Sequence, residues 1–165
     1  TQKAVLFSGS ISDNITFGES ACEISKDGVD KAVTLAQAKE FVDKLEDGAD
    51  YKIAQGGRNV SGGQKQRLSI ARALARGAEI LIFDDSFSAL DYRTDAALRN
   101  GLAENLSDTT KIIVAQRVST IRHADRILVM NDGKIVGNGT HEELMKTCNI
   151  YREIANSQLS EKELA

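Results

Sequence analysis

Hydrophobic residues follow two different spacings along this chain. Residues 80–83 and 112–115 are continuous apolar runs, which favour strands buried on both faces of a parallel sheet. Over residues 27–46, 64–76 and 94–106, apolar positions recur at helical spacing instead. Strands that alternate with helices in this order predict an α/β domain.

The remaining segments carry local signals. Asn131-Asp132-Gly133 separates two apolar runs and predicts a β-hairpin. Thr140 and Glu143 have the spacing of a capping box, so a last helix is expected to begin there. The glycine-rich stretch 48–63 is predicted to be a loop. The buried side of the last helix is expected to carry Leu144, Cys148 and Tyr151.

Composition narrows the class of protein. The 165 residues suit a single domain. The chain has 21 Lys and Arg against 24 Asp and Glu, a formal net charge of -3, which argues against nucleic acid as the main partner. No apolar run approaches about 18 residues, so no membrane span is predicted. Cys22 and Cys148 lie far apart and fit no metal spacing, so both are expected to stay reduced.

Ser61-Gly62-Gly63-Gln64 stands at the start of a predicted helix and has the chemistry of an anion site. The two glycines permit close approach to backbone N–H groups, the serine adds a hydroxyl, and the helix start contributes partial positive charge. A glycine turn with a serine cap would explain the same residues without any ligand.

Two adjacent carboxylates follow the first predicted strand. Asp84 and Asp85 lie at its carboxyl end, where open α/β sheets place their ligands. In P-loop ATPases such residues support Mg²⁺ and the attacking water. Two acids that cap the following helix are the alternative interpretation.

The order of these motifs resembles the nucleotide-binding domain of ATP-binding cassette (ABC) transporters of the exporter type. Ser61 to Gln64 match the signature motif of that family. The other matching segments are Gln2 (glutamine loop), 80–85 (Walker B), 88–91 (D-loop), 112–121 with Gln116 (switch) and 132–144 (C-terminal hairpin and helix).

The resemblance implies an α/β fold, with part of a P-loop NTPase (RecA-like) core and an ABC helical subdomain. Residues 1–165 are then part of one ABC ATPase domain. Its helical subdomain with the signature motif spans about 11–75, and the portion of the RecA-like core spans about 76–155. No G-x-x-x-x-G-K-[ST] phosphate loop occurs in the sequence, so the chain is expected to be a C-terminal fragment of that domain.

The same resemblance assigns roles to these residues, with ATP and Mg²⁺ as cofactors. Ser61, Gly62 and Gly63, with Gln64 in the same motif, are implied to bind the γ-phosphate of ATP held by a partner domain. Asp84 is implied to hold Mg²⁺ through water. Gln2 is a metal-binding and coupling candidate, and Asp91 is implied to communicate between two ATP sites.

Two catalytic positions depart from the family pattern. Asp85 replaces the usual glutamate, and its shorter side chain makes a weaker base. Gln116 replaces the switch histidine and cannot carry a positive charge or relay a proton. His123 and His141 are expected to be surface or capping residues. Together the two changes resemble the degenerate subunit of a heterodimeric exporter.

The implied function is ATP binding and hydrolysis that power transmembrane export by a parent protein, at the cytoplasmic face of the membrane. The expected partners are a second nucleotide-binding domain, in a heterodimer, and the coupling helices of a transmembrane domain, which residues 51–59 would touch. The isolated chain is expected to be inactive and to self-associate through exposed sheet edges. Two alternatives to an exporter are a soluble ABC ATPase without transport activity and a non-catalytic dimerisation module.

Overall fold

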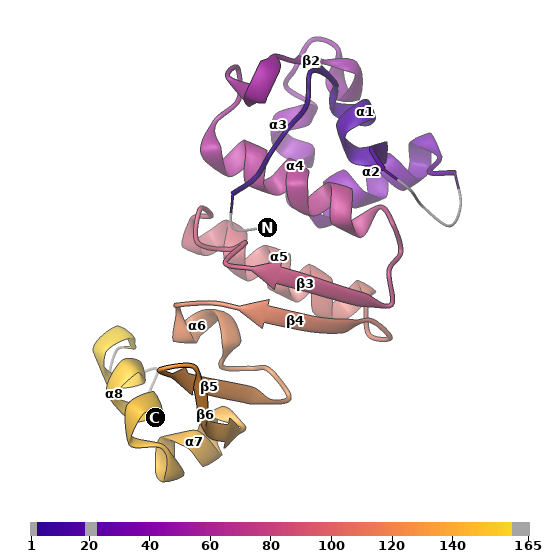
Figure 1. The fold of residues 1–165 in the computed structure, drawn as a ribbon. Helices are drawn as coiled ribbons and strands as arrows, with labels where there is room; N and C mark the ends of the chain where they lie inside the picture. The colour runs from indigo at the N-terminus through magenta and orange to yellow at the C-terminus, as the bar shows by residue number, and fades with distance from the viewer. Residues whose placement is uncertain (1–2, 19–22, 160–165) are drawn as a thin grey trace. The chain divides into compact units, whose positions relative to one another are not determined.

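The computed structural model describes residues 3–18 and 23–159 and separates into two compact units, residues 1–114 and 115–165 (Figure 1). Each unit has its own hydrophobic cluster. The predicted subdomain division near residue 75 lies inside the first unit and stays a prediction. Gln2 and Cys22 lie outside the described residues.

The first unit places short helices before its parallel strands. In chain order its elements are β1 (Gly9–Ser10), α1 (Ile11–Thr16), α2 (Lys26–Leu35), α3 (Lys39–Val42), η1 (Gly48–Asp50), β2 (Lys52–Ile53), η2 (Gln55–Gly57), α4 (Gly62–Leu74), β3 (Ile80–Asp84), α5 (Tyr92–Asn105) and β4 (Thr110–Val114). α1 and α2 both pack against α4, and the antiparallel pair β1–β2 lies beside α1.

The helix predicted over residues 27–46 is wrong in its extent, because the chain breaks between α2 and α3. Gln37 adopts a left-handed conformation with a φ of 56°, although it is not a glycine. Its N–H donates to the Thr34 carbonyl, and the Ala38 N–H donates to the Val33 carbonyl, so the last carbonyls of α2 are satisfied. This break carries no glycine or proline signal in the sequence.

Asn14, buried in α1, ties the segment before this helix to α4. Its Oδ1 accepts from the Phe7 N–H at 2.8 Å and from Arg72 Nη2 at 3.0 Å. Its Nδ2 donates to the carbonyls of Phe7 and Ser10, at 2.9 and 3.0 Å. The side chain is 2% exposed, so water cannot replace these bonds.

Replacing Asn14 with alanine is expected to lower the free energy of unfolding by about 3 kcal/mol, because buried backbone groups lose their partners. Chemical denaturation followed by circular dichroism would measure this loss. Ser12→Ala on the same helix is the control and should change stability by less than about 0.5 kcal/mol. An Asn14→Ala variant as stable as that control would contradict the role given to this network.

The strands β3 and β4 form a parallel pair in which Ile82 lies opposite Ile112. Leu81 and Phe83 point into the first hydrophobic cluster, together with Leu98 and Leu102 of α5. The prediction that both strands are buried on two faces is wrong for the structure described. The opposite face is exposed, with Ile80, Ile82, Ile112 and Val114 showing 57, 65, 49 and 53% of their surface. Within the first unit, no described element covers this face.

The second unit begins after β4 and confirms the predicted hairpin. β5 (Ile127–Asn131) and β6 (Lys134–Gly139) pair antiparallel. The turn between them uses Asp132 and Gly133, whose φ values of 47° and 74° are those of a type I′ turn. α6 (Val118–Ile121) precedes the hairpin, and α7 (His141–Thr147) and α8 (Asn149–Gln158) follow it.

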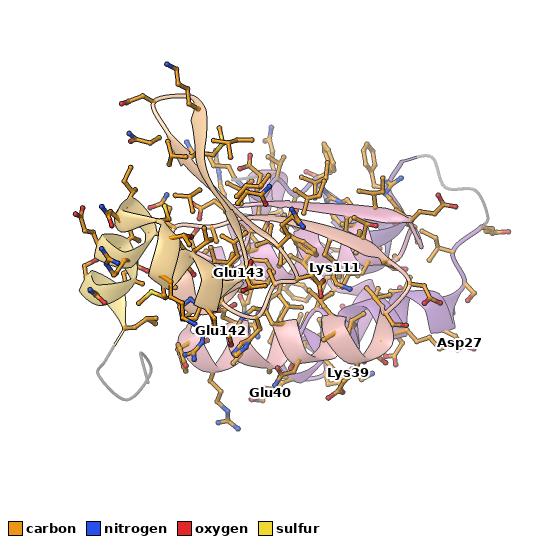
Figure 2. All side chains as sticks on the ribbon, turned by 90° about the horizontal axis from the view of Figure 1, so that it is seen from below. Asp27, Lys39, Glu40, Lys111, Glu142 and Glu143 are labelled. Carbon is orange, nitrogen blue, oxygen red and sulfur yellow. The ribbon has the colours of Figure 1, made fainter. Side chains whose placement is uncertain are left out.

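The capping box predicted at Thr140 is confirmed. The Thr140 hydroxyl accepts from the Glu143 N–H at 3.3 Å, and Glu143, labelled in Figure 2, accepts from the Thr140 N–H at 2.9 Å. The single last helix is corrected to two, because Cys148 leaves the helical conformation at φ −118° and ψ 105°. Leu144, Cys148 and Tyr151 are nevertheless all buried, as their spacing predicted, and Cys148 is a free thiol.

Candidate functional site

The signature segment forms the exposed start of α4. Ser61 is the residue before the helix, and its hydroxyl accepts from the Gln64 N–H at 3.3 Å. Gln64 in turn accepts from the Ser61 N–H at 2.8 Å, which completes a capping box. The helix therefore begins at Gly62, two residues before the predicted start. The serine cap that the alternative interpretation required is thus present, and the anion-site interpretation must rest on the glycines.

The two glycines of this segment have no conformational need to be glycine. Neither Gly62 nor Gly63 has a positive φ. A Cβ on Gly62 would meet nothing within 4 Å, and one on Gly63 would lie 3.4 Å from the Ala89 carbonyl oxygen. Because glycine weakens a helix by up to about 1 kcal/mol relative to alanine, their presence here needs a reason outside the described chain. Close approach of a ligand to the backbone N–H groups would supply that reason.

The D-loop segment 88–91 lies beside the start of α4, as the contact between Gly63 and Ala89 shows. Asp91 precedes α5 and caps it: one carboxylate oxygen accepts from the Thr94 N–H at 3.0 Å, and the other accepts from the Thr94 hydroxyl at 2.7 Å. The bonds from Thr94 lower the pKa of Asp91, so its carboxylate is ionised at neutral pH. Sequence reasoning assigned Asp91 to communication between sites and missed this cap.

The two carboxylates at the end of β3, Asp84 and Asp85, differ in backbone and exposure. Asp84 is exposed on the same face of the strand pair as Ile82. Asp85 is half-buried and has a φ of 47°, a left-handed conformation that aspartate tolerates better than most residues. Its N–H donates to the Val114 carbonyl at 2.9 Å, and its carbonyl accepts from the Ser88 hydroxyl at 2.8 Å. These bonds fix the turn that leads from Walker B into the D-loop.

Arg67, on α4, connects this region to the turn at Gln37, and no pattern in the sequence predicts this link. Its Nη1 donates to the Gln37 carbonyl at 2.8 Å, and its guanidinium lies 4.8 Å from the centroid of the Phe41 ring. Burial lowers the pKa of Arg67, while the carboxylates of Asp91 and Glu40 act in the opposite direction (Glu40 is labelled in Figure 2). Arg67 therefore lies half-buried on α4, against the turn at Gln37 and the Phe41 ring of α3.

The segment 51–59 before the signature is held together by Asn59. The Asn59 side chain accepts from the Ala54 N–H at 2.9 Å and donates to the Lys52 carbonyl at 2.9 Å. It also donates to the Tyr51 hydroxyl at 3.2 Å. The stretch predicted to be a loop, 48–63, contains η1, β2 and η2. The Asn59 bonds mean that the shape of segment 51–59 is set by its own residues.

The switch segment lies in the second unit. Gln116 is exposed, and its carbonyl accepts from Gln158 Nε2 at 2.8 Å. His123 is also exposed. His141 is the first residue of α7, with Nδ1 at 2.8 Å from the Tyr151 hydroxyl oxygen, and burial together with the charge of Arg122 lowers its pKa. Both histidines thus lie at the surface or at a helix start, as expected.

Residues 3–18 and 23–159 contain neither a helix that could span a membrane nor a cluster of metal-binding side chains. No helix there is long and apolar enough to cross a membrane. No group of three or more His, Cys, Asp and Glu side chains there could hold a metal ion. Asp84 is exposed, so its carboxylate is open to solvent.

Comparison with known proteins gives consistent matches. The ABC transporter family model matches residues 1–88. An uncharacterized ABC transporter ATP-binding protein of Mycobacterium tuberculosis is 45% identical over 158 residues, which are 95% of this chain and 27% of that protein. An ATP-dependent lipid A-core flippase of Xylella fastidiosa is 38% identical over 161 residues, with 98% of this chain and 27% of that protein covered.

A solved structure of a bacterial Atm1-family ABC exporter with ATP bound is similar at a TM-score of 0.90 and 36% identity, covering 98% of this chain and 28% of that one. The chain therefore spans about a quarter of the length of the proteins that it matches. These matches confirm the predicted α/β fold as that of an ABC exporter's nucleotide-binding domain, a P-loop NTPase fold. The chain belongs to the ABC transporter family.

Proposed function

We propose that this chain is the part of an ABC exporter's ATPase domain that supplies the signature, Walker B, D-loop and switch elements. In this proposal Ser61, Gly62 and Gly63 bind the γ-phosphate of an ATP held by a second nucleotide-binding domain. ATP hydrolysis at the paired domains powers export by the parent protein, at the cytoplasmic face of the membrane. The relatives named as a flippase and an exporter support this reading.

The observation that carries the proposal is the start of α4. Two glycines occupy the first helical turn without any steric or conformational need for them, and Gly62 is exposed. Among the described residues the Ser61 hydroxyl accepts one hydrogen bond and has no acceptor for its own hydrogen. A phosphate oxygen placed there would receive the Ser61 O–H and the free N–H groups of the first turn.

The second ATP site of the proposed dimer is the one in which the parent of this chain itself binds ATP. Asp84 would hold Mg²⁺, which neutralises phosphate charge during phosphoryl transfer. Asp85 would orient the attacking water and Gln116 would donate to a γ-phosphate oxygen, each less effectively than the glutamate and histidine of active relatives. The proposal therefore assigns this chain to the weaker half of a heterodimer, with its signature serving the stronger site.

The same proposal assigns two contact surfaces to this chain. Residues 51–59 would contact the coupling helices of the transmembrane domain, and their shape is held by Asn59. The exposed apolar face of β3–β4 would make the isolated chain self-associate, because exposed strands and apolar surface favour pairing with another copy. The isolated chain is proposed to have little ATPase activity of its own.

Ser61→Ala in the full-length protein tests the proposed function through the steady-state rate of Mg-ATP hydrolysis. The variant loses both a phosphate donor and a helix cap, and we expect its rate to fall by at least tenfold. Thr140→Ala is the matched control, because it removes another capping box without touching the signature. It should lose similar stability and keep its hydrolysis rate. Equal rates for the wild type and Ser61→Ala would contradict the proposal.

A further inference from the structure

The side chain of Gln158 holds the backbone of the switch segment at two points. Its Nε2 donates to the Gln116 carbonyl at 2.8 Å, and its Oε1 accepts from the Val118 N–H, also at 2.8 Å. Both partners flank Arg117. The amide of glutamine offers one donor group and one acceptor, so a single side chain satisfies both backbone groups.

The start of α6 depends on this contact. Arg117 precedes the helix and makes no side-chain capping bond. Arginine has no acceptor atom, so it cannot receive an N–H group of the first turn. Gln158 supplies that acceptor from 40 residues further along the chain. The start of the four-residue helix α6 therefore depends on the position of Gln158 in α8.

α8 in turn is anchored by an apolar stripe. Tyr151, Ala155 and Leu159 recur every four residues, are between 0 and 8% exposed, and belong to the same hydrophobic cluster as Val118. Residues at this spacing share one face of a helix. The buried stripe thus fixes the end of α8, and with it Gln158, against the backbone that follows Gln116.

We propose that Gln158 is a positioning residue for the switch: it fixes the backbone on both sides of Arg117 so that the exposed Gln116 side chain is presented to the γ-phosphate. The role of Gln116 in this inference rests on the function proposed above. The docking of α8 would then set the position of the switch, which makes the C-terminal helix part of the catalytic apparatus without touching ATP.

Three variants of the full-length protein separate this role from a general loss of structure. Gln158→Leu removes both hydrogen bonds. Gln158→Glu keeps an acceptor for the Val118 N–H but has no hydrogen for the Gln116 carbonyl. Asn156→Leu makes the same kind of change at an exposed amide two residues earlier in α8 and serves as the control.

The first readout is hydrogen exchange of the peptide that contains the Val118 amide, in the protein without nucleotide. We expect exchange about tenfold faster in Gln158→Leu, with Gln158→Glu closer to the wild type, because the amide loses its acceptor only in the first variant. The second readout is Mg-ATP hydrolysis at this chain's own ATP site, in the full-length protein paired with a partner domain whose own site is inactivated. We expect kcat to fall by about tenfold in Gln158→Leu while KM changes by less than twofold, since Gln116 acts on the transferred phosphate.

The control should match the wild type in both readouts, and all variants should keep the melting temperature within a few degrees. Unchanged exchange at Val118 in Gln158→Leu would overturn the clamp itself. Faster exchange with an unchanged kcat would overturn its positioning role. Absence of ATPase activity in the wild type with its active partner domain would instead contradict the proposed function, and the exchange readout would still decide whether Gln158 holds the switch backbone.

Discussion

Under the proposed function, replacing Asp85 with glutamate and Gln116 with histidine is expected to raise turnover at the ATP site of the full-length parent protein by on the order of 10²-fold. The glutamate extends the carboxylate by one methylene toward the attacking water. The histidine can carry positive charge beside the γ-phosphate, which glutamine cannot. Single-turnover hydrolysis by the full-length protein with its partner domain would measure the gain.

The backbone at Asp85 provides the control for this experiment. Asp85 and Asp132 both have a φ of 47°, a conformation that aspartate adopts more readily than glutamate. Asp85→Glu is therefore expected to cost on the order of 1 kcal/mol of stability. Asp132→Glu, in the hairpin turn, should cost about the same and leave turnover unchanged. A double variant within twofold of the wild-type turnover would contradict the weakened-site reading.

Gly62→Ala is expected to have opposite effects on stability and on hydrolysis. Because nothing lies within 4 Å of the added Cβ, the helix should gain up to about 1 kcal/mol. The same methyl group would stand between the backbone N–H groups and a phosphate. We therefore expect ATP hydrolysis at the partner's site to fall by on the order of 10²-fold.

Thermal melting and steady-state ATPase assays of the full-length protein would measure the two effects together. Gly28→Ala, in the first turn of α2, makes the same substitution away from the signature and should leave hydrolysis unchanged. An ATPase rate in Gly62→Ala equal to that of the control would mean that no ligand approaches α4 at this point.

The sequence predicted those features whose cause is local. The hairpin at Asp132-Gly133 and the capping box at Thr140 depend on residues within four positions of each other, and both are confirmed. The signature segment was recognised for the same reason, because its serine, glycines and helix start are contiguous.

Features that depend on distant partners could not be predicted. Arg67 reaches the carbonyl of Gln37 across 30 residues, and Gln158 reaches Gln116 across 42. The sequence around Gln37 contains no glycine or proline that would predict the break between α2 and α3. The continuous apolar runs in β3 and β4 predicted strands buried on both faces, but one of their faces is exposed. Apolar composition shows only that a residue can be buried, and does not show what covers it.

Vanadate-induced photocleavage tests the central claim, that the start of α4 meets a γ-phosphate, most directly. Vanadate takes the place of the γ-phosphate beside ADP, and irradiation cleaves the backbone next to it. In the full-length protein with its partner, we expect cleavage of this chain between Ser61 and Gly63 when Mg²⁺, ADP and vanadate are all present, and mass spectrometry would locate the cleaved bond. Trapped vanadate that cleaves the complex elsewhere and leaves Ser61 to Gly63 intact would contradict it.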